Sequence, residues 1–168
     1  MDVSPVAAIE KNITSQMLNT WNVAPADDFL ESRVTMLFNN DVNIVVAAPR
    51  KSMSDYFYKN ADADEVIFVH KGSGTLRTMV GNLKFEYADY IVIPRGMIYQ
   101  IEFDTEDNRL LITESFSPVV TPKRYRNNNG QMLEDSPFCE RDFRLPTDLE
   151  THQESGDFVI KIRKENQL

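Results

Sequence analysis

The middle of the chain alternates short apolar runs with turn-forming residues. Eight runs rich in β-branched and aromatic residues cover residues 33–39, 41–49, 64–71, 75–80, 83–87, 90–94, 97–103 and 109–116. Turn signals separate them, including Gly72-Ser73-Gly74 and Gly81-Asn82. Short strands at this spacing predict an all-β sandwich or barrel.

Polar and apolar residues also alternate within the runs. In the run 83–87, Leu83, Phe85 and Tyr87 share one face, and Lys84 and Glu86 share the other. This two-residue period predicts strands with one face toward a core and one face toward solvent.

The N-terminal segment has a different period. Ile9, Ile13, Met17 and Trp21 are spaced four residues apart. This spacing predicts an amphipathic helix or an arm over residues 9–21.

The C-terminal region has little periodicity. Residues 117–156 are rich in Pro, Asn, Asp and Glu, and residues 158–163 alternate like a short final strand. We therefore expect an N-terminal helical or irregular arm (1–32), a core barrel (33–116), and a long C-terminal arm with a returning strand (117–168).

A long irregular tract inside a compact domain is unusual. Two packing arrangements are open: the tract packs on its own barrel, or on a partner. The contact points would be its apolar members, Val119, Val120, Met132, Leu133, Phe138, Phe143 and Leu145.

Composition narrows the functional classes. A chain of 168 residues with a net charge of −8 suits one acidic domain that binds neither nucleic acid nor membranes. The basic run at 122–130 reads as a solvated loop. There is no signal peptide and no run of about 20 apolar residues, so we expect a cytoplasmic protein. The single cysteine, Cys139, forms no internal disulfide and is expected to be half-buried.

Two half-motifs narrow the all-β prediction to a cupin-type jelly-roll barrel (a double-stranded β-helix). The first cupin motif reads His-x-His, three or four residues, Glu, six residues, Gly. Glu65 and Gly72 match its end, and Tyr58 and Asn60 stand where the histidines would be. In the second motif, residues 88–99 keep the Pro-x-Gly turn.

Two positions of this second motif are altered. Ala88 stands in place of its first glycine, and Tyr99 stands in place of its histidine. Three histidines and a glutamate are the usual cupin ligands for iron, manganese, nickel or zinc. Only the glutamate is present, so we expect no metal in this chain.

The two histidines do not repair the site. His70 lies five residues after Glu65, and an odd separation along a strand places two side chains on opposite faces. His152 lies in an acidic tract remote from the motifs. Cys139 has no histidine near it in sequence, and the chain contains no nucleophile elbow, P-loop or dinucleotide fingerprint.

Two interpretations of the altered motif remain open. Tyr58, Asn60, Glu65, Arg95 and Tyr99 could bind a small polar ligand at the barrel mouth, where burial would raise the pKa of Glu65. Alternatively, Glu65 is a structural plug that is hydrogen-bonded to the tyrosine hydroxyls.

Two segments, 57–99 and 136–146, resemble the N-terminal half of bacterial-type homogentisate 1,2-dioxygenases, and the similarity covers roughly residues 33–163. The runs "NADADEVIFVHKGSG" and "DYIVIPRGMIY" carry it. The resemblance implies a non-haem Fe(II) enzyme that opens the ring of homogentisate with O₂ in tyrosine and phenylalanine catabolism. It also implies that the iron ligands lie in a C-terminal half, so none of them falls on this chain.

The favoured hypothesis is a metal-free domain, inert alone, whose partner is a missing C-terminal catalytic half or further copies in a homo-oligomer. The alternative is a stand-alone metal-free cupin that binds or isomerises a small polar or aromatic-acid ligand.

Overall fold

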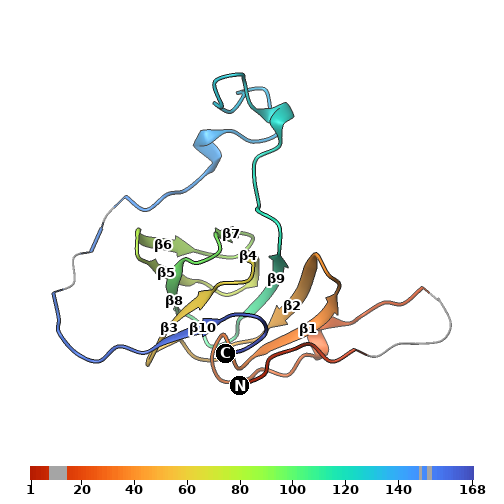
Figure 1. The fold of residues 1–168 in the computed structure, drawn as a ribbon, viewed down its shortest axis with the longest axis vertical. Coiled ribbons are helices and arrows are strands. Elements are labelled where there is room, and N and C mark those ends of the chain that lie inside the picture. The colour runs from red at the N-terminus through yellow and green to blue at the C-terminus, as the bar shows by residue number, and fades with distance from the viewer. Residues whose placement is uncertain (8–14, 148, 151–152) are drawn as a thin grey trace.

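The computed structural model describes residues 1–7, 15–147, 149–150 and 153–168. Two five-stranded sheets face each other and form a cupin-type jelly-roll barrel, as predicted (Figure 1). The first sheet has the order β1 (Arg33–Phe38), β2 (Val42–Ala47), β9 (Arg109–Ser115), β4 (Asp64–Lys71) and β7 (Tyr90–Ile93). The second has the order β10 (Ile160–Arg163), β3 (Phe57–Asn60), β8 (Ile98–Phe103), β5 (Gly74–Thr78) and β6 (Gly81–Phe85).

All neighbouring strands are antiparallel except β10, which runs parallel to β3. The returning strand was predicted from its alternation. Strand β3, which carries Tyr58 and Asn60, was not predicted, because its four residues contain two polar side chains and no β-branched one.

The core lies between the sheets and is built from inward-facing residues of both. Ile67 and Ile112 of the first sheet and Tyr58, Tyr99 and Ile101 of the second are at most 1% exposed. Large aliphatic and aromatic side chains on both inner faces interdigitate, as in other two-sheet cores.

One predicted hairpin is displaced by two residues. We expected the turn at Gly81-Asn82, but it lies at Met79 and Val80, and Gly81 begins β6. The Thr78 hydroxyl accepts a hydrogen bond from the Val80 amide at 3.2 Å and donates one to the Gly81 carbonyl at 2.7 Å. This side-chain turn ends β5 early.

The two-residue displacement of strand β6 has a second consequence. Leu83 and Phe85 face the core as expected. Tyr87 lies beyond the strand and is 69% exposed, so its predicted inward position was wrong.

The first cupin motif ends in a glycine for a steric reason. Gly72 has φ +108°, a conformation that L side chains rarely adopt. A Cβ atom there would lie 2.1 Å from the Asn108 side-chain oxygen, so the turn after β4 accepts only glycine.

The N-terminal segment is an arm where the structure describes it. Ile9 and Ile13 lie outside the described residues. Residues 15–19 have no helical structure, and the short 3₁₀ turn η1 (Thr20–Asn22) follows them. No helix in the described part of the chain is long and apolar enough to cross a membrane.

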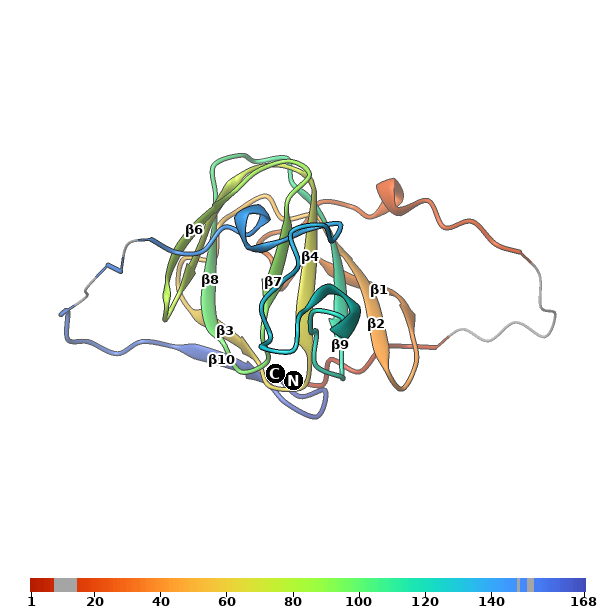
Figure 2. The same cartoon turned by 90° about the horizontal axis from the view of Figure 1, so that it is seen from above.

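The C-terminal arm projects from the barrel and then returns to it (Figures 1 and 2). Its described part contains two short turns, η2 (Lys123–Tyr125) and η3 (Glu140–Asp142). The aromatic ring of Phe138 contacts the rings of both Tyr125 and Phe143, and these contacts link η2 to η3. We refer to residues 123–143 as the arm head.

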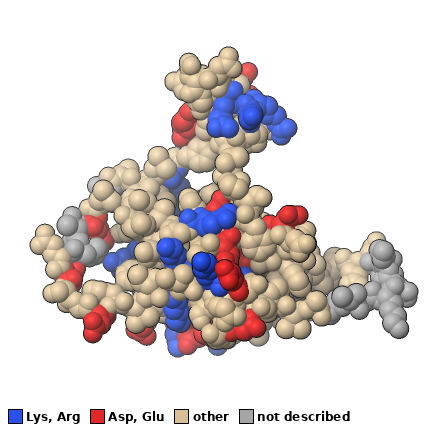
Figure 3. All heavy atoms as spheres, in the orientation of Figure 1, with Lys and Arg blue, Asp and Glu red and all other residues tan. Residues whose placement is uncertain are grey.

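The C-terminal arm leaves much of its own apolar surface uncovered. None of the seven predicted contact residues belongs to the barrel core, and four are exposed: Val119, Val120, Phe143 and Leu145. Cys139, expected to be half-buried, is 4% exposed. Figure 3 shows the head joined to the barrel by a narrow neck and carrying a group of basic side chains.

Candidate functional site

Strands β4 and β9 place two carboxylates side by side inside the barrel. Glu65 and Glu114 are directly paired across the two antiparallel strands, and both side chains are fully buried. Directly opposed like charges destabilise a sheet, and a buried charge costs several kcal/mol unless it is paired. The barrel must therefore supply cations to this position.

Two arginines on the edge strands β1 and β10 supply that positive charge. Arg33 at the start of β1 donates from one guanidinium nitrogen to Glu65 at 2.9 Å and from the other to Glu114 at 2.5 Å. Arg163 at the end of β10 donates to the same Glu114 oxygen at 2.6 Å. The Arg33 and Arg163 side chains are 10% and 11% exposed.

Neutral side chains satisfy the remaining oxygens. The Tyr99 hydroxyl donates to Glu65 at 2.7 Å. The amide nitrogens of Asn43 and Asn60 lie 2.9 and 3.3 Å from Glu114. The ring of Tyr58 packs edge-on against that of Tyr99, with centroids 5.5 Å apart. We call these eight residues the buried charged cluster: Arg33, Asn43, Tyr58, Asn60, Glu65, Tyr99, Glu114 and Arg163.

The cluster perturbs the ionisation of several members. Burial alone would raise the pKa of Glu114, but Arg33, Arg163 and Asn43 outweigh it and hold that pKa below its usual value. Burial raises the pKa of both Tyr58 and Tyr99, and the nearby Glu65 carboxylate raises it further. Near neutral pH the cluster therefore holds a Glu114 carboxylate and two neutral tyrosines.

The residues present do not fit the metal that the fold implies. A cupin metal needs several imidazole donors, and these positions hold Tyr58, Asn60 and Tyr99. Glu65 already accepts from Arg33 and Tyr99, and a guanidinium beside it would repel a cation. Among residues 1–7, 15–147, 149–150 and 153–168, no three His, Cys, Asp or Glu side chains form a group that could bind a metal.

The structure brings together four of the five residues proposed for the barrel mouth. Tyr58, Asn60, Glu65 and Tyr99 lie within the cluster, at most 3% exposed, in the barrel interior rather than at an open mouth. Arg95 lies elsewhere. Its backbone amide donates to Asp64, and its guanidinium donates to the Phe116 carbonyl, both at 2.9 Å.

The histidines lie outside the cluster. His70 is exposed on the outer face of β4, opposite to Glu65 as predicted, and packs edge-on against Trp21 with ring centroids 5.1 Å apart. His152 lies outside the described residues.

Sequence reasoning missed four members of the cluster, namely Arg33, Asn43, Glu114 and Arg163. One had a detectable signal: Leu110, Ile112 and Glu114 share a face of β9, so the alternation already placed Glu114 toward the core. The arginines had no such signal, because their partners lie far away in the sequence.

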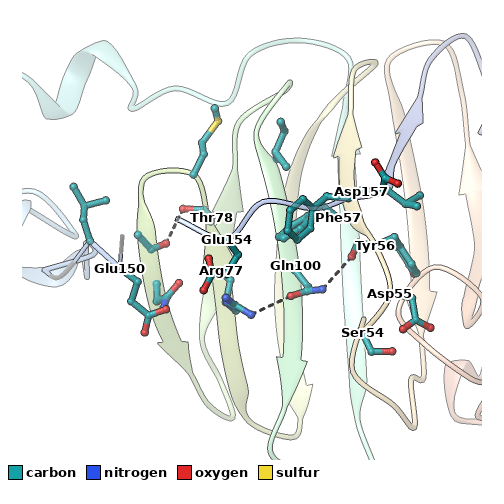
Figure 4. Close-up of a pocket in the computed structure, with 17 residues that line it drawn as sticks. Ser54, Asp55, Tyr56, Phe57, Arg77, Thr78, Gln100, Glu150, Glu154 and Asp157 are labelled. Carbon is teal, nitrogen blue, oxygen red and sulfur yellow. Dashed lines mark hydrogen bonds between the residues drawn. The ribbon is translucent and has the colours of Figure 1, made fainter. Parts of the chain in front are cut away.

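A groove lies outside the barrel, between the second sheet and the returning C-terminal arm (Figure 4). Its volume is about 670 Å³. Arg77, Gln100 and Phe57 line it from the sheet, and Glu150 and Phe158 line it from the arm. In its floor, Arg77 donates to Gln100 at 3.3 Å and Gln100 donates to the Tyr56 carbonyl at 3.1 Å.

Comparison with known sequences identifies the family. Residues 7–167 match the family described as "Homogentisate 1,2-dioxygenase N-terminal". The chain belongs to this family. The resemblance deduced from the motifs is therefore confirmed, and the chain is a cupin-type, dioxygenase-like domain.

A curated relative extends this result. A protein of Saccharolobus solfataricus named "putative dioxygenase" is 33% identical over 149 residues, which are 89% of this chain and 38% of the relative. The chain thus spans well under half of that relative's length.

Solved structures show the fold. A protein titled "putative mannose-6-phosphate isomerase" from Ralstonia eutropha has a TM-score of 0.51 at 16% identity, covering 60% of this chain and 98% of that one. The protein TT1209 from Thermus thermophilus has a TM-score of 0.51 at 10% identity, covering 60% and 97%. A cupin-2 domain-containing protein from Shewanella frigidimarina has a TM-score of 0.43 at 21% identity, covering 50% and 79%.

Proposed function

We propose that this chain is a metal-free domain of a homogentisate 1,2-dioxygenase-like protein, with a scaffolding and assembly role and no turnover of its own. The ring-opening of homogentisate with O₂ would belong to a second half that carries Fe(II). The family match and the short span of the relative that this chain covers support this assignment.

The observation that carries the proposal is the burial of the Glu65 carboxylate and its pairing with protein groups. Glu65 is the one carboxylate left from the cupin metal motifs, and it is fully buried between Arg33 and the Tyr99 hydroxyl. A carboxylate that is paired with a guanidinium binds a divalent cation poorly, because the guanidinium occupies its oxygen and repels a second positive charge. The buried charged cluster thus joins the two sheets where other cupins coordinate a metal.

Metal analysis tests this proposal. The purified chain is incubated anaerobically with Fe(II), desalted, and measured by inductively coupled plasma mass spectrometry, with Mn, Ni and Zn in parallel. We expect substoichiometric metal and no homogentisate-dependent O₂ uptake. Stoichiometric retention of any of these metals, or turnover by this chain alone, would contradict the proposal.

The external groove favours a second candidate, a metal-free cupin that binds a small polar or aromatic-acid ligand. Its volume of about 670 Å³ falls within the range of small-molecule sites, and Phe57 and Phe158 could stack on a ring. A thermal-shift screen with aromatic acids and sugars tests it. A hit that an Arg77→Ala variant abolishes and a Glu65→Gln variant retains would favour the groove over the barrel interior.

A further inference from the structure

The external groove lies where the returning C-terminal arm crosses the outer face of the second sheet (Figure 4). Arg77 and Gln100 are directly paired on β5 and β8, so their side chains share a face. Their chain neighbours Leu76 and Tyr99 belong to the core, so this shared face is the outer one. Gln100 is nevertheless only 5% exposed, which shows that this part of the outer face is sheltered from solvent.

The charged residues that line the groove are mostly acidic. Four acidic residues and one basic residue line it, namely Asp55, Glu150, Glu154, Asp157 and Arg77. The Arg77 guanidinium is already paired, because it donates to Glu102 at 2.7 Å. Lys59 and Lys161, on the neighbouring strands β3 and β10, are not among the lining residues. The groove therefore carries an excess of negative charge that attracts cations.

Two of these carboxylates lie at the same end of the groove. The Phe57 amide donates to the Val159 carbonyl at 2.9 Å, and from this contact β3 and β10 run parallel. Asp55 and Asp157 each lie two residues before the contact on their own segments, and Figure 4 shows both at one end. Both residues are exposed, and no side chain in the described part of the chain pairs with either carboxylate.

The rest of the lining suits the body of a small molecule. Its apolar members come from the sheet and from the arm: Phe57, Met79, Ile98, Leu149, Phe158 and Val159. In the floor, the Gln100 amide donates one hydrogen to the Tyr56 carbonyl at 3.1 Å. Its second amide hydrogen has no acceptor among the described residues, so it can donate to a ligand.

We propose that this groove binds a small organic cation, an ammonium group on an apolar or aromatic body that carries a hydrogen-bond acceptor. The ammonium pairs with Asp55 and Asp157, the body lies along the apolar lining, and the acceptor meets Gln100. The inference rests on the second candidate function above and narrows its ligand to a cation. The groove disfavours aromatic acids, because the acidic lining repels a ligand carboxylate.

Isothermal titration calorimetry of the whole chain tests the charge requirement with three matched probes. para-Methoxyphenethylamine is a cation, para-methoxyphenethyl alcohol is neutral, and para-methoxyphenylpropionate is an anion. We expect saturable one-to-one binding of the amine and at least about fivefold weaker binding of the other two, because only the amine forms ion pairs. Added salt should reduce this difference, since it screens exposed charges.

A charge-matched pair of variants locates the binding site. The double variant Asp55→Asn/Asp157→Asn should weaken binding of the amine by about fivefold and leave binding of the alcohol unchanged. Glu134→Gln/Asp135→Asn is the control, because it changes the net charge equally in exposed residues of the arm head. Its affinity for the amine should equal that of the wild-type chain. Circular dichroism shows whether each variant keeps the fold.

Three results would overturn the inference. They are an amine that does not bind below about 10 mM, a propionate that binds as tightly as the amine, and a folded Asp55→Asn/Asp157→Asn variant with unchanged affinity. Tight binding of the propionate would overturn the cation while supporting the second candidate function. The favoured metal-free role is tested by metal analysis, which none of these titrations affects.

Discussion

Arg163, five residues before the last residue of the chain, donates a 2.6 Å hydrogen bond to Glu114 inside the barrel. Arg33 reaches the same carboxylate oxygen from the first strand of the core. Glu114 therefore binds both ends of the fold at once. Because β10 also extends the second sheet, the buried charged cluster couples the C-terminal arm to the stability of the whole barrel.

The first prediction concerns this ion pair. Arg163→Met should lower the free energy of unfolding by about 3 kcal/mol, because it leaves excess negative charge buried around Glu114. Urea unfolding measures the change. Arg141→Met, in a side chain that is 71% exposed on the arm, is the control and should have almost no effect. Equal stability of the two variants would show that β10 does not depend on the cluster.

The second prediction concerns acid pH. The pKa of Glu114 in the folded chain lies below the ordinary value of 4.5. Its contribution to stability is therefore fully present above about pH 4.5 and is lost as pH falls through the lower folded pKa. The free energy of unfolding should decline from pH 5 to pH 3, and Glu114→Gln should flatten that decline. Glu134→Gln, in the exposed arm head, should leave the slope of the free energy of unfolding against pH unchanged.

The third prediction concerns alkaline pH. Burial raises the pKa of Tyr56, Tyr58 and Tyr99 well above the ordinary value of 10. These three of the six tyrosines should stay protonated in the folded chain at pH 11, and unfolding with urea should release their phenolate absorbance at 295 nm. The unfolded chain ionises them near pH 10, so stability falls as pH rises above that value. Native titration of all six near pH 10 would contradict this.

The fourth prediction concerns the second cupin motif, where Ala88 replaces a glycine. Ala88 has φ +72°, in the left-handed region that costs an L residue about 1–2 kcal/mol. Ala88→Gly should raise the midpoint of urea unfolding, although the greater freedom of glycine in the unfolded chain offsets part of the gain. Gly96→Ala is the reciprocal control at φ +84°, where a Cβ atom has room but the backbone is strained, and it should lower the midpoint.

Much of the barrel could be predicted from local patterns. Runs of β-branched and aromatic residues between turn signals located eight strands of the barrel. Two-residue alternation placed Glu65 and His70 on opposite faces, because a strand's geometry fixes the side of each residue from its neighbours. The turn of the hairpin after Thr78 was predicted two residues too late, because a side-chain hydrogen bond, rather than glycine, ends the strand there.

Alternation alone does not show which face is the inner one. In β10, Ile160 and Ile162 are exposed, while Lys161 and Arg163 turn inward. A hydrophobicity pattern predicts the opposite. The charged face lies inside for two reasons. Arg163 donates a hydrogen bond to the buried Glu114 carboxylate. The Lys161 ammonium nitrogen lies 3.7 Å from the centre of the Tyr56 ring.

The sequence by itself determined the barrel, the family resemblance and the replacement of three histidines by Tyr58, Asn60 and Tyr99, because these depend on local period and fixed motif spacing. Only the tertiary structure decided what occupies their place. Arg33 and Glu114 are 81 residues apart, and Arg163 is 49 residues beyond Glu114. These charges are far apart in the sequence and come together only in the folded chain. A buried carboxylate needs such a cationic partner, because an unpaired charge in the interior is strongly destabilising.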